Sequence, residues 1–307
     1  MITKPMLADK AKDVNKLEYP LLATPKIDGI RCLKVGGKAL TRSFKPIPND
    51  HIRTTLERLL PEGADGEIFS GTTFQQCTSA VMSQAGAPPF RHCMFDYVRD
   101  NLDKPYRQRL RDMLDWHRTT STEAQAAVWV LPFVTIHDAD ELRRYEVEVL
   151  KDGHEGVMVR SPDGPYKCGR ATNREGYLLK VVRFETTEAL VIGFEEQMHN
   201  ENELGQDAFG NAKRSSAKAG KVPAGTLGKF KVRQMEDYTT ILGATIKAGT
   251  EFTIGTGEGL TADLRQKIWD DQEGYLDEMV KYKFKPHGVL NKPRMPIWLG
   301  FRDARDM

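Results

Sequence analysis

The amino-acid sequence predicts a mixed α+β protein in which a domain of antiparallel sheets and helices, residues 1–184, precedes a small β-barrel domain, residues 185–307. Three observations support this fold class. The 307 residues are enough for one large domain or two domains of ordinary size. Strand and helix signals alternate as far as Phe184, and beyond it well-separated strand candidates accompany one candidate helix. The seam between the domains is therefore expected within residues 183–187.

The amino-terminal domain is expected to begin with strands that carry opposite charges on one face. The first three strands are predicted at 21–28, 30–35 and 38–43, with Gly36 and Gly37 as the hairpin turn between the last two. Side chains two apart on a strand point to the same face. Lys26 and Asp28 are therefore expected side by side on the first strand.

The remainder of this domain continues the alternation of strands and helices. A helix follows Asn49 or Asp50, either of which can cap it, because apolar residues then recur at helical spacing up to Leu60. Asp138 and Glu141 form a capping box for another helix that ends near Gly153. The other expected elements are strands at 64–69, 90–98, 155–161 and 177–184 and a helix at 105–118.

After Phe184 the sequence indicates a barrel assembled from separated strands. The strand candidates are at 188–197, 225–234, 250–257 and 280–286, and Thr261 caps a candidate helix at 262–272. Several strands with one helix in about 120 residues are what a closed barrel of the OB type needs. Between the first two strands, residues 199–224 are polar, basic and contain Gly and Ser, so a long mobile loop is expected there.

Composition is that of a soluble globular protein, with 39% hydrophobic and 29% charged residues. No apolar run approaches the roughly 20 residues that cross a bilayer, and the amino terminus has no signal-peptide core, so no membrane partner is expected. The four cysteines are scattered without a CxxC pair. This spacing argues against a disulfide framework and a zinc module, and it favours a reducing cytoplasm.

Basic residues are concentrated in the last third of the chain, although the formal net charge is only +2. Residues 208–235 and 280–301 contain no Asp or Glu, yet both stretches carry several lysines and arginines. One such run is often only a solvated face. Two runs in one region favour a phosphate backbone as the partner.

The segment KIDGIR, residues 26–31, has the chemistry of a phosphoryl-transfer site. A lysine amine attacks phosphorus only in its neutral form, and a partly buried strand lysine that faces phosphates and a metal ion can lose its proton more readily. Asp28 can orient the amine of Lys26 or help to hold the metal, and Gly29 lets the backbone approach a ligand closely. Arg31 offers a planar fork for phosphate or sugar oxygens.

KIDGIR resembles the nucleotidyl-lysine motif of the covalent nucleotidyltransferases, which comprise ATP-dependent DNA ligases, RNA ligases and mRNA capping enzymes. Further motifs of that family follow in its usual order up to residue 303, and together they resemble a minimal ATP-dependent DNA ligase of phage type. The resemblance implies a nucleotidyltransferase (adenylation) domain, in which Lys26 becomes adenylylated, and an OB-fold domain. It implies ATP and Mg²⁺ or Mn²⁺ as cofactors, nicked duplex DNA as substrate, a monomer, and a cytoplasmic location in a bacterium or as a bacteriophage product.

The resemblance assigns roles to particular residues of this chain. Thr24 would line the ATP site next to Lys26, and Arg42 in TRSFKPIP would meet the 5′-phosphate of the nick. Glu67 in DGEIF would bind the ribose hydroxyl and help to hold the metal, and Phe95 in MFDYV would stack on the purine. Glu155 in EGVMVR would bind the metal, and Lys180 in YLLKVVRF would contact the α-phosphate.

The chain departs from the family pattern at two places. The family usually has a second lysine two positions after Lys180, where this chain has Val182. The second phosphate contact then comes from Lys167 or Arg170 in YKCGR. In the carboxy-terminal motif PRMPIWLGFRD, Arg302 and Asp303 would orient the pyrophosphate leaving group, although the lysine that usually follows is absent.

The basic stretches are expected to supply the contacts with the DNA backbone. The residues assigned to DNA are Arg42, Lys213, Arg214, Lys218, Lys221, Lys281, Lys283 and Arg294. In KYKFK, residues 281–285, lysines alternate with two aromatic residues that are expected to fill the barrel core. The alternatives are an RNA ligase, a GTP-using capping guanylyltransferase, and a non-catalytic nucleic-acid-binding protein with an OB barrel.

Overall fold

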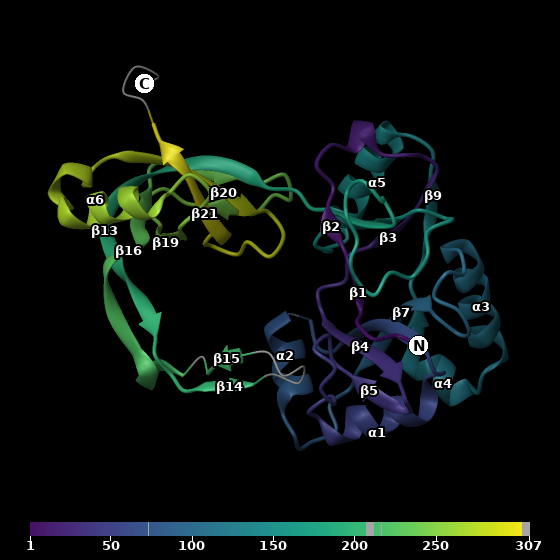
Figure 1. Ribbon diagram of the computed structural model, residues 1–307. Helices are drawn as coiled ribbons and strands as arrows, with labels where there is room; N and C mark the ends of the chain where they lie inside the picture. Colours follow the sequence, from purple (N-terminus) through teal and green to yellow (C-terminus); the bar gives the residue numbers. More distant parts are fainter. Residues whose placement is uncertain (73, 207–211, 216, 303–307) are drawn as a thin grey trace. The chain divides into compact units, whose positions relative to one another are not determined.

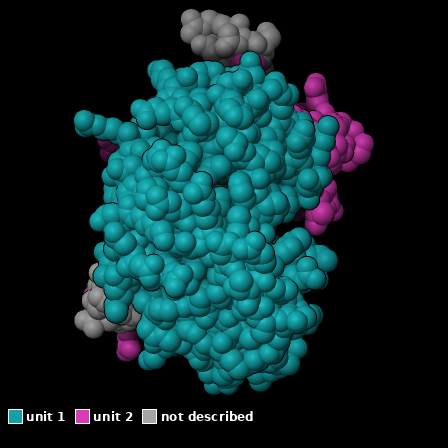
Figure 2. Space-filling model, turned by 90° about the vertical axis from the view of Figure 1, so that its right-hand side faces the viewer, with its two compact units in different colours: residues 1–182 teal, residues 183–307 magenta. Residues whose placement is uncertain are grey.

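The protein folds into two compact units, Met1–Val182 and Arg183–Met307 (Figure 2). A computed structural model describes residues 1–72, 74–206, 212–215 and 217–302. The predicted boundary after residue 184 lies two residues from this division. In the described parts of the chain, no helix has the length and apolar character needed to cross a membrane.

Unit 1 contains two five-stranded sheets. The first has the order β2-β12-β10-β3-β9 and the second the order β5-β4-β6-β7-β8. The strands of the first sheet are β2 (Asp9–Lys10), β3 (Leu21–Pro25), β9 (Val134–Ile136), β10 (Val157–Arg160) and β12 (Leu178–Val181). Those of the second are β4 (Ile30–Val35), β5 (Lys38–Leu40), β6 (Ala64–Phe69), β7 (Arg91–Tyr97) and β8 (Val128–Val130). A separate parallel pair joins β1 (Met6–Leu7) to β11 (Gly169–Arg170). Most pairs are antiparallel, as predicted.

The described residues of unit 1 form five helices, and three of these begin where the sequence predicts. Asn49 is the N-cap of α1 and accepts a hydrogen bond from the amide of Ile52. Asp138 caps α5 by accepting from the amides of Asp140 and Glu141. The helices are α1 (Asp50–Leu59), α2 (Phe74–Met82), α3 (Tyr106–Thr119), α4 (Thr122–Ala127) and α5 (Ala139–Lys151), with a 3₁₀ turn, η1, at Val14–Lys16. Neither α2 nor α4 is predicted from the sequence.

The first predicted strand is three residues too long. β3 ends at Pro25, so Lys26 and Asp28 lie on the connection to β4 and not side by side on a strand. The reason is topological, because β3 belongs to one sheet and β4 to the other, and the chain must leave the first sheet to enter the second. Gly29 permits this crossing, since a Cβ there would lie 2.3 Å from the carbonyl oxygen of Ile68.

His92 makes the sheet that carries Glu67 and Phe95 sensitive to acid. The ring is fully buried on β7 against Gly66, and its Nε2 donates to the carbonyl of Cys32 at 3.1 Å. Burial lowers the pKa of His92 to about 4, and the bond to the Cys32 carbonyl opposes that shift. Because the unfolded chain binds this proton near its ordinary pKa of about 6.5, the stability present above that pH is lost as the pH falls toward 4.

We expect unit 1 to lose about 3 kcal/mol of unfolding free energy between pH 6.5 and pH 4 through His92 alone. The variant His92→Gln keeps an N–H for the Cys32 carbonyl but does not titrate, so its stability should change less over that interval. Urea denaturation at pH 7.5 and at pH 4 measures the difference. Equal pH dependence of the two proteins would show that His92 is not the acid-sensitive group.

Unit 2 is a closed barrel with the strand order β13-β16-β19-β21-β20, and this confirms the predicted barrel domain (Figure 1). Its strands are β13 (Glu185–Asn200), β16 (Lys221–Gln234), β19 (Glu251–Gly255), β20 (Met279–Lys285) and β21 (Arg294–Phe301). Smaller elements are β17 (Tyr238–Thr239), β18 (Thr245–Ile246), α6 (Ala262–Asp270) and the 3₁₀ turn η3 (Glu273–Tyr275). Tyr282 and Phe284 are fully buried in the barrel core, as the alternation in KYKFK predicts, and Phe230 is buried with them.

The prediction of a long loop at 199–224 is wrong for the described residues of that segment. β13 and β16 continue as an antiparallel ribbon beyond the barrel to the pair Asn200–Lys221 (Figure 1). β14 (Leu204–Gln206), β15 (Ala212–Arg214) and a 3₁₀ turn, η2 (Lys218–Gly220), follow. We call the described residues 195–206, 212–215 and 217–228 the arm.

Hydrogen bonds from side chains and backbone hold the outer part of the arm together. Asn200 donates to the carbonyl of Ser215 at 2.9 Å, and Asn202 donates to that of Ala217 at 2.7 Å. The amide of Glu201 donates to the carbonyl of Gly220 at 2.7 Å. Asn and Asp side chains often hold backbone turns in this way, so a polar segment without strand alternation can still be ordered.

Candidate active site

A pocket of about 290 Å³ lies in unit 1 and is lined by strands of both five-stranded sheets. β3, β10 and β12 contribute side chains from the first sheet, and β4, β6 and β7 contribute Arg31, Glu67 and Phe95 from the second. Lys26 and Ile27 line it from the connection between the sheets. The pocket therefore gathers most of the residues predicted for ATP. The other lining residues are Leu7, Ala8, Thr24, Pro25, Arg42, Met158, Arg160, Arg170, Leu178 and Lys180.

The amine of Lys26 forms an ion pair with the carboxylate of Glu155. The Glu155 side chain is only 7% exposed, whereas that of Lys26 is 23% exposed. Backbone bonds hold the two segments together, because the amide of Lys26 donates to the carbonyl of Gly156 at 2.8 Å. The predicted nucleophile, which lines the pocket, is therefore paired with the predicted metal ligand, although the two are 129 positions apart.

Glu67 is a half-buried carboxyl that faces cations in the pocket. Burial raises the pKa of Glu67 to about 7, while Arg31 and then Lys26 oppose the shift by favouring its ionised form. Arg31 is its direct partner in register across β4 and β6. A carboxyl with a pKa near neutrality accepts hydrogen bonds from a sugar when ionised and also donates one when protonated.

Arg31 lines the pocket, but one fork of its guanidinium is already engaged. Its Nε and Nη2 donate to the two carboxylate oxygens of Asp65, each at 2.5 Å, and Nη2 also donates to the carbonyl of Met6. Burial disfavours the charged form, but Asp65 outweighs burial and raises the pKa of Arg31 above its ordinary value. A phosphate therefore cannot take this fork while the pair with Asp65 persists.

Phe95 lies close to two pocket arginines. The guanidinium carbon of Arg31 is 4.7 Å from the ring centre, and that of Arg160 is 5.5 Å from it. Arg160 is itself held by Asp96, which also accepts from Arg109. Asp96 is fully buried and the two arginines almost so. This cluster fixes the backbone next to Phe95.

Thr24 and Lys180 line the pocket from the first sheet, on strands that flank β10. Both are in register with Met158, which belongs to the strand between theirs. Arg42 also lines the pocket and is exposed to solvent. Asp28 is not one of the lining residues, although its charge acts to raise the pKa of Glu67.

The two candidates for the second phosphate contact differ in position. Arg170 lines the pocket, and its Nη1 donates to the carbonyl of Ala8 at 2.7 Å. Lys167 is not among the lining residues and pairs with Glu175 at 2.6 Å. Val182 is only 9% exposed. We therefore favour Arg170 over Lys167 for that role.

The remaining predicted site residues belong to unit 2 or lie outside the described residues. Arg302 forms an ion pair of 2.6 Å with Glu188, and Asp303 lies outside the described residues. Lys213 is on β15, and Arg214 and Lys218 are exposed on the arm. Lys221 begins β16, Lys281 and Lys283 are on β20, and Arg294 begins β21.

Sequence reasoning missed Arg160, Asp65 and Tyr166. Arg160 lies two residues after Met158 on the same strand, so both side chains point to the same face of the sheet. This spacing is a signal that could have placed Arg160 at the pocket. The hydroxyl of Tyr166 donates to Asp65 across 101 positions at 2.7 Å. No local pattern in a single sequence predicts such a contact.

Comparison with known proteins identifies relatives of both units. Residues 5–181 match the family model of the ATP dependent DNA ligase domain. The solved structure of Chlorella virus DNA ligase-adenylate is 36% identical, with a TM-score of 0.57, over 98% of this chain and 100% of that one. A structure from a study of Lig E DNA ligases is 22% identical with a TM-score of 0.66, covers 98% of this chain and 100% of its own, and shares the fold.

The curated relatives are longer proteins. A probable DNA ligase of Beutenbergia cavernae is 30% identical over 222 residues, which are 62% of this chain and 41% of that protein. The match to a DNA ligase of Halobacterium salinarum is 33% identical over 33% of this chain and 16% of that protein. The chain thus spans less than half the length of these curated relatives.

Proposed function

Because the chain belongs to the family of ATP-dependent DNA ligases, we propose that it seals nicks between a 5′-phosphate and a 3′-hydroxyl in duplex DNA through a lysyl-AMP intermediate. The observation that carries this proposal is the position of Lys26, whose amine lies at a pocket lined by Thr24, Glu67, Phe95 and Lys180. A nucleotide with its base against Phe95 and its ribose near Glu67 would direct its α-phosphate toward Lys26 and Lys180, which line the same pocket.

The first step joins Lys26 to AMP. The Nζ atom attacks the α-phosphorus of ATP, an N–P bond forms, and the bond to pyrophosphate breaks. The amine must first give up a proton to water, and its ion pair with Glu155 then breaks, which leaves that carboxylate for other partners. Lys180 and Arg170 face the same pocket and would neutralise the phosphate oxygens as charge shifts to the leaving group.

Glu155 and Glu67 would hold the divalent ion. Mg²⁺ and Mn²⁺ prefer carboxylate oxygens and phosphates, and both carboxylates interact with Lys26. Among the described residues, no three His, Cys, Asp or Glu side chains cluster so that they could hold a metal ion. This arrangement suits an ion that is bound by few carboxylates together with ATP. When bound, the ion would neutralise charge on the triphosphate.

In the later steps AMP passes to the 5′-phosphate of the nick, and the 3′-hydroxyl then displaces it. We assign the 5′-phosphate to Arg42, which is exposed at the pocket. Arg31 is better suited to the ribose or base than to a phosphate, because one fork of its guanidinium is held by Asp65. Arg302 and Asp303 remain assigned to the pyrophosphate, and the pair of Arg302 with Glu188 would have to break for that interaction.

The arm would bind the DNA backbone without reading its sequence. We expect the triple variant Arg214→Ala, Lys218→Ala, Lys221→Ala to bind nicked DNA more weakly and to form lysyl-AMP normally. For every DNA phosphate that the variant no longer neutralises, the slope of log K against log salt should become shallower by about 0.9. Fluorescence anisotropy with a nicked duplex over a series of salt concentrations measures this slope.

The matched control is Lys267→Ala, which removes an exposed lysine from α6 on the same unit. It should leave the salt slope nearly unchanged. If the triple variant loses adenylylation to the same degree as DNA binding, the arm acts on the fold and not on DNA.

The proposed function is tested by incubating the protein with Mg²⁺ and α-labelled ATP or GTP, followed by denaturing electrophoresis. We expect label from ATP alone, and we expect nicked DNA to discharge it as the nick is sealed. Label from GTP would instead indicate a capping enzyme, and discharge by nicked RNA alone would indicate an RNA ligase. No label from either nucleotide would indicate a nucleic-acid binder without catalysis.

A further inference from the structure

The amino-terminal strand forms one wall of the nucleotide pocket. Leu7 and Ala8 line the pocket, and β1 pairs with β11 in parallel, with Leu7 opposite Arg170. The Arg170 side chain also donates to the carbonyl of Ala8 at 2.7 Å. The position of this short strand therefore determines the shape of the pocket.

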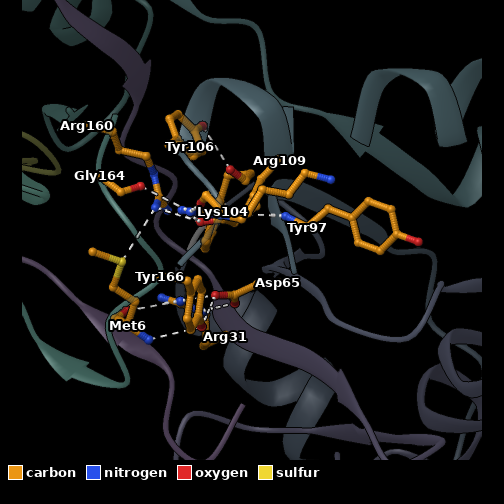
Figure 3. Close-up of polar contacts among 12 residues, drawn as sticks. Met6, Arg31, Asp65, Tyr97, Lys104, Tyr106, Arg109, Arg160, Gly164 and Tyr166 are labelled. Carbon is orange, nitrogen blue, oxygen red and sulfur yellow. Dashed lines mark hydrogen bonds and ion pairs between the residues drawn. The ribbon is translucent and has the colours of Figure 1, made fainter. Parts of the chain in front are cut away.

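A closed ring of hydrogen bonds ties this strand to Arg31 (Figure 3). The amide of Met6 donates to the hydroxyl of Tyr166 at 3.0 Å, and that hydroxyl donates to Oδ2 of Asp65 at 2.7 Å. Nη2 of Arg31 donates to the same Oδ2 at 2.5 Å and to the carbonyl of Met6 at 3.2 Å. The backbone of Met6 and the side chains of Tyr166, Asp65 and Arg31 are thus joined by one continuous ring of hydrogen bonds.

The ring is shielded from water. Met6 and Asp65 are fully buried, and Tyr166 is 2% exposed. Burial and the nearby Asp65 carboxylate raise the pKa of Tyr166 well above its ordinary value, so the hydroxyl stays protonated and donates. Buried polar groups that lose a partner cannot turn to water instead, so each bond of the ring matters more than a surface bond.

We propose that Tyr166 is a positioning residue for nucleotide binding, whose hydroxyl aligns Asp65 and Arg31 and fixes the strand that lines the pocket. Tyr166 does not line the pocket itself. Without its hydroxyl, the amide of Met6 loses its acceptor and Asp65 loses a donor. The strand that lines the pocket and the Arg31 guanidinium are then held less firmly in position. This inference rests on the proposed function, because ATP is taken as the occupant of the pocket.

The test is the rate of lysyl-AMP formation by Tyr166→Phe as a function of ATP concentration. We expect the KM for ATP to rise about tenfold, the size of effect expected for losing one hydrogen bond to a charged group. The maximal rate should stay within about twofold, because Lys26 and Glu155 are untouched. A reduced maximal rate with an unchanged KM overturns the proposal.

The matched control is Tyr282→Phe, which removes another buried tyrosine hydroxyl. It bonds to Gln234 at 2.9 Å in the barrel core, and it should leave the KM for ATP unchanged. An equal rise of KM in this control overturns the proposal, because the effect then reflects general stability.

A double-mutant cycle with Arg31→Lys tests the route through Arg31. Lysine cannot form the two-pronged pair with Asp65, so removing the Tyr166 hydroxyl should raise KM much less in that background. If the effects of the two substitutions on the free energy of ATP binding simply add, Tyr166 does not act through Arg31, and that part of the proposal is overturned. If the unaltered protein forms no lysyl-AMP at all, the proposed function is wrong. The role of Tyr166 can then be tested separately, by comparing the equilibrium binding of ATP to the unaltered protein and to the variants.

Discussion

The variant Lys26→Arg is expected to form no lysyl-AMP, a loss of at least about 10⁴-fold relative to the unaltered protein. Arginine preserves the positive charge and can keep the ion pair with Glu155, so the pocket should remain folded. Its guanidinium is always protonated and is not a nucleophile. Transfer of label from α-labelled ATP to protein measures the effect.

The control is Lys38→Arg on β5, where the lysine is exposed. It should be labelled as fast as the unaltered protein. If Lys26→Arg is still labelled at a measurable rate, another residue is the nucleophile, and the assignment of the pocket as an adenylylation site has to be revised.

The variant Asp96→Asn is expected to lose about 3–5 kcal/mol of unfolding free energy. Asp96 accepts hydrogen bonds from Arg109 and Arg160, and the exposed fractions of the three side chains are 0%, 1% and 4%. Asparagine has nearly the same shape but no charge, so two buried guanidinium groups would lack a counter-ion. Denaturation by urea measures the loss.

The control for this prediction is Asp100→Asn, an aspartate whose side chain is 66% exposed. It should change stability by no more than about 0.5 kcal/mol.

Burial acts to raise the pKa of Asp96, but Arg109 and Arg160 outweigh burial and lower it below the ordinary value. The stabilisation from Asp96 is therefore present at neutral pH and lost as the pH falls through that lowered pKa. A loss under 1 kcal/mol in Asp96→Asn would contradict the account of this cluster.

The sequence predicts the chemistry of the site better than its geometry. The order of motifs from KIDGIR to EGVMVR predicts Lys26, Glu67 and Glu155 in one site; Lys26 and Glu67 line the pocket, and Glu155 forms an ion pair with Lys26. The end of β3 was predicted wrongly, because the alternation of side chains does not reveal that the chain changes sheets after Pro25.

Long-range pairs explain most of what the sequence could not predict. Asp65 looks like an ordinary member of DGEIF, but in the structure it holds the Arg31 fork and the Tyr166 hydroxyl. The arm was missed for a different reason, since its order comes from Asn side chains bonded to backbone and not from an apolar face. Patterns of hydrophobic residues carry no information about either kind of interaction.

The measurement that tests the central claim most directly is peptide mapping by mass spectrometry after incubation with ATP and Mg²⁺. The account predicts one AMP group per chain, attached to Nζ of Lys26 and released by nicked DNA. AMP on a different lysine, such as Lys180, or no attached AMP under conditions where nicks are sealed, would contradict it.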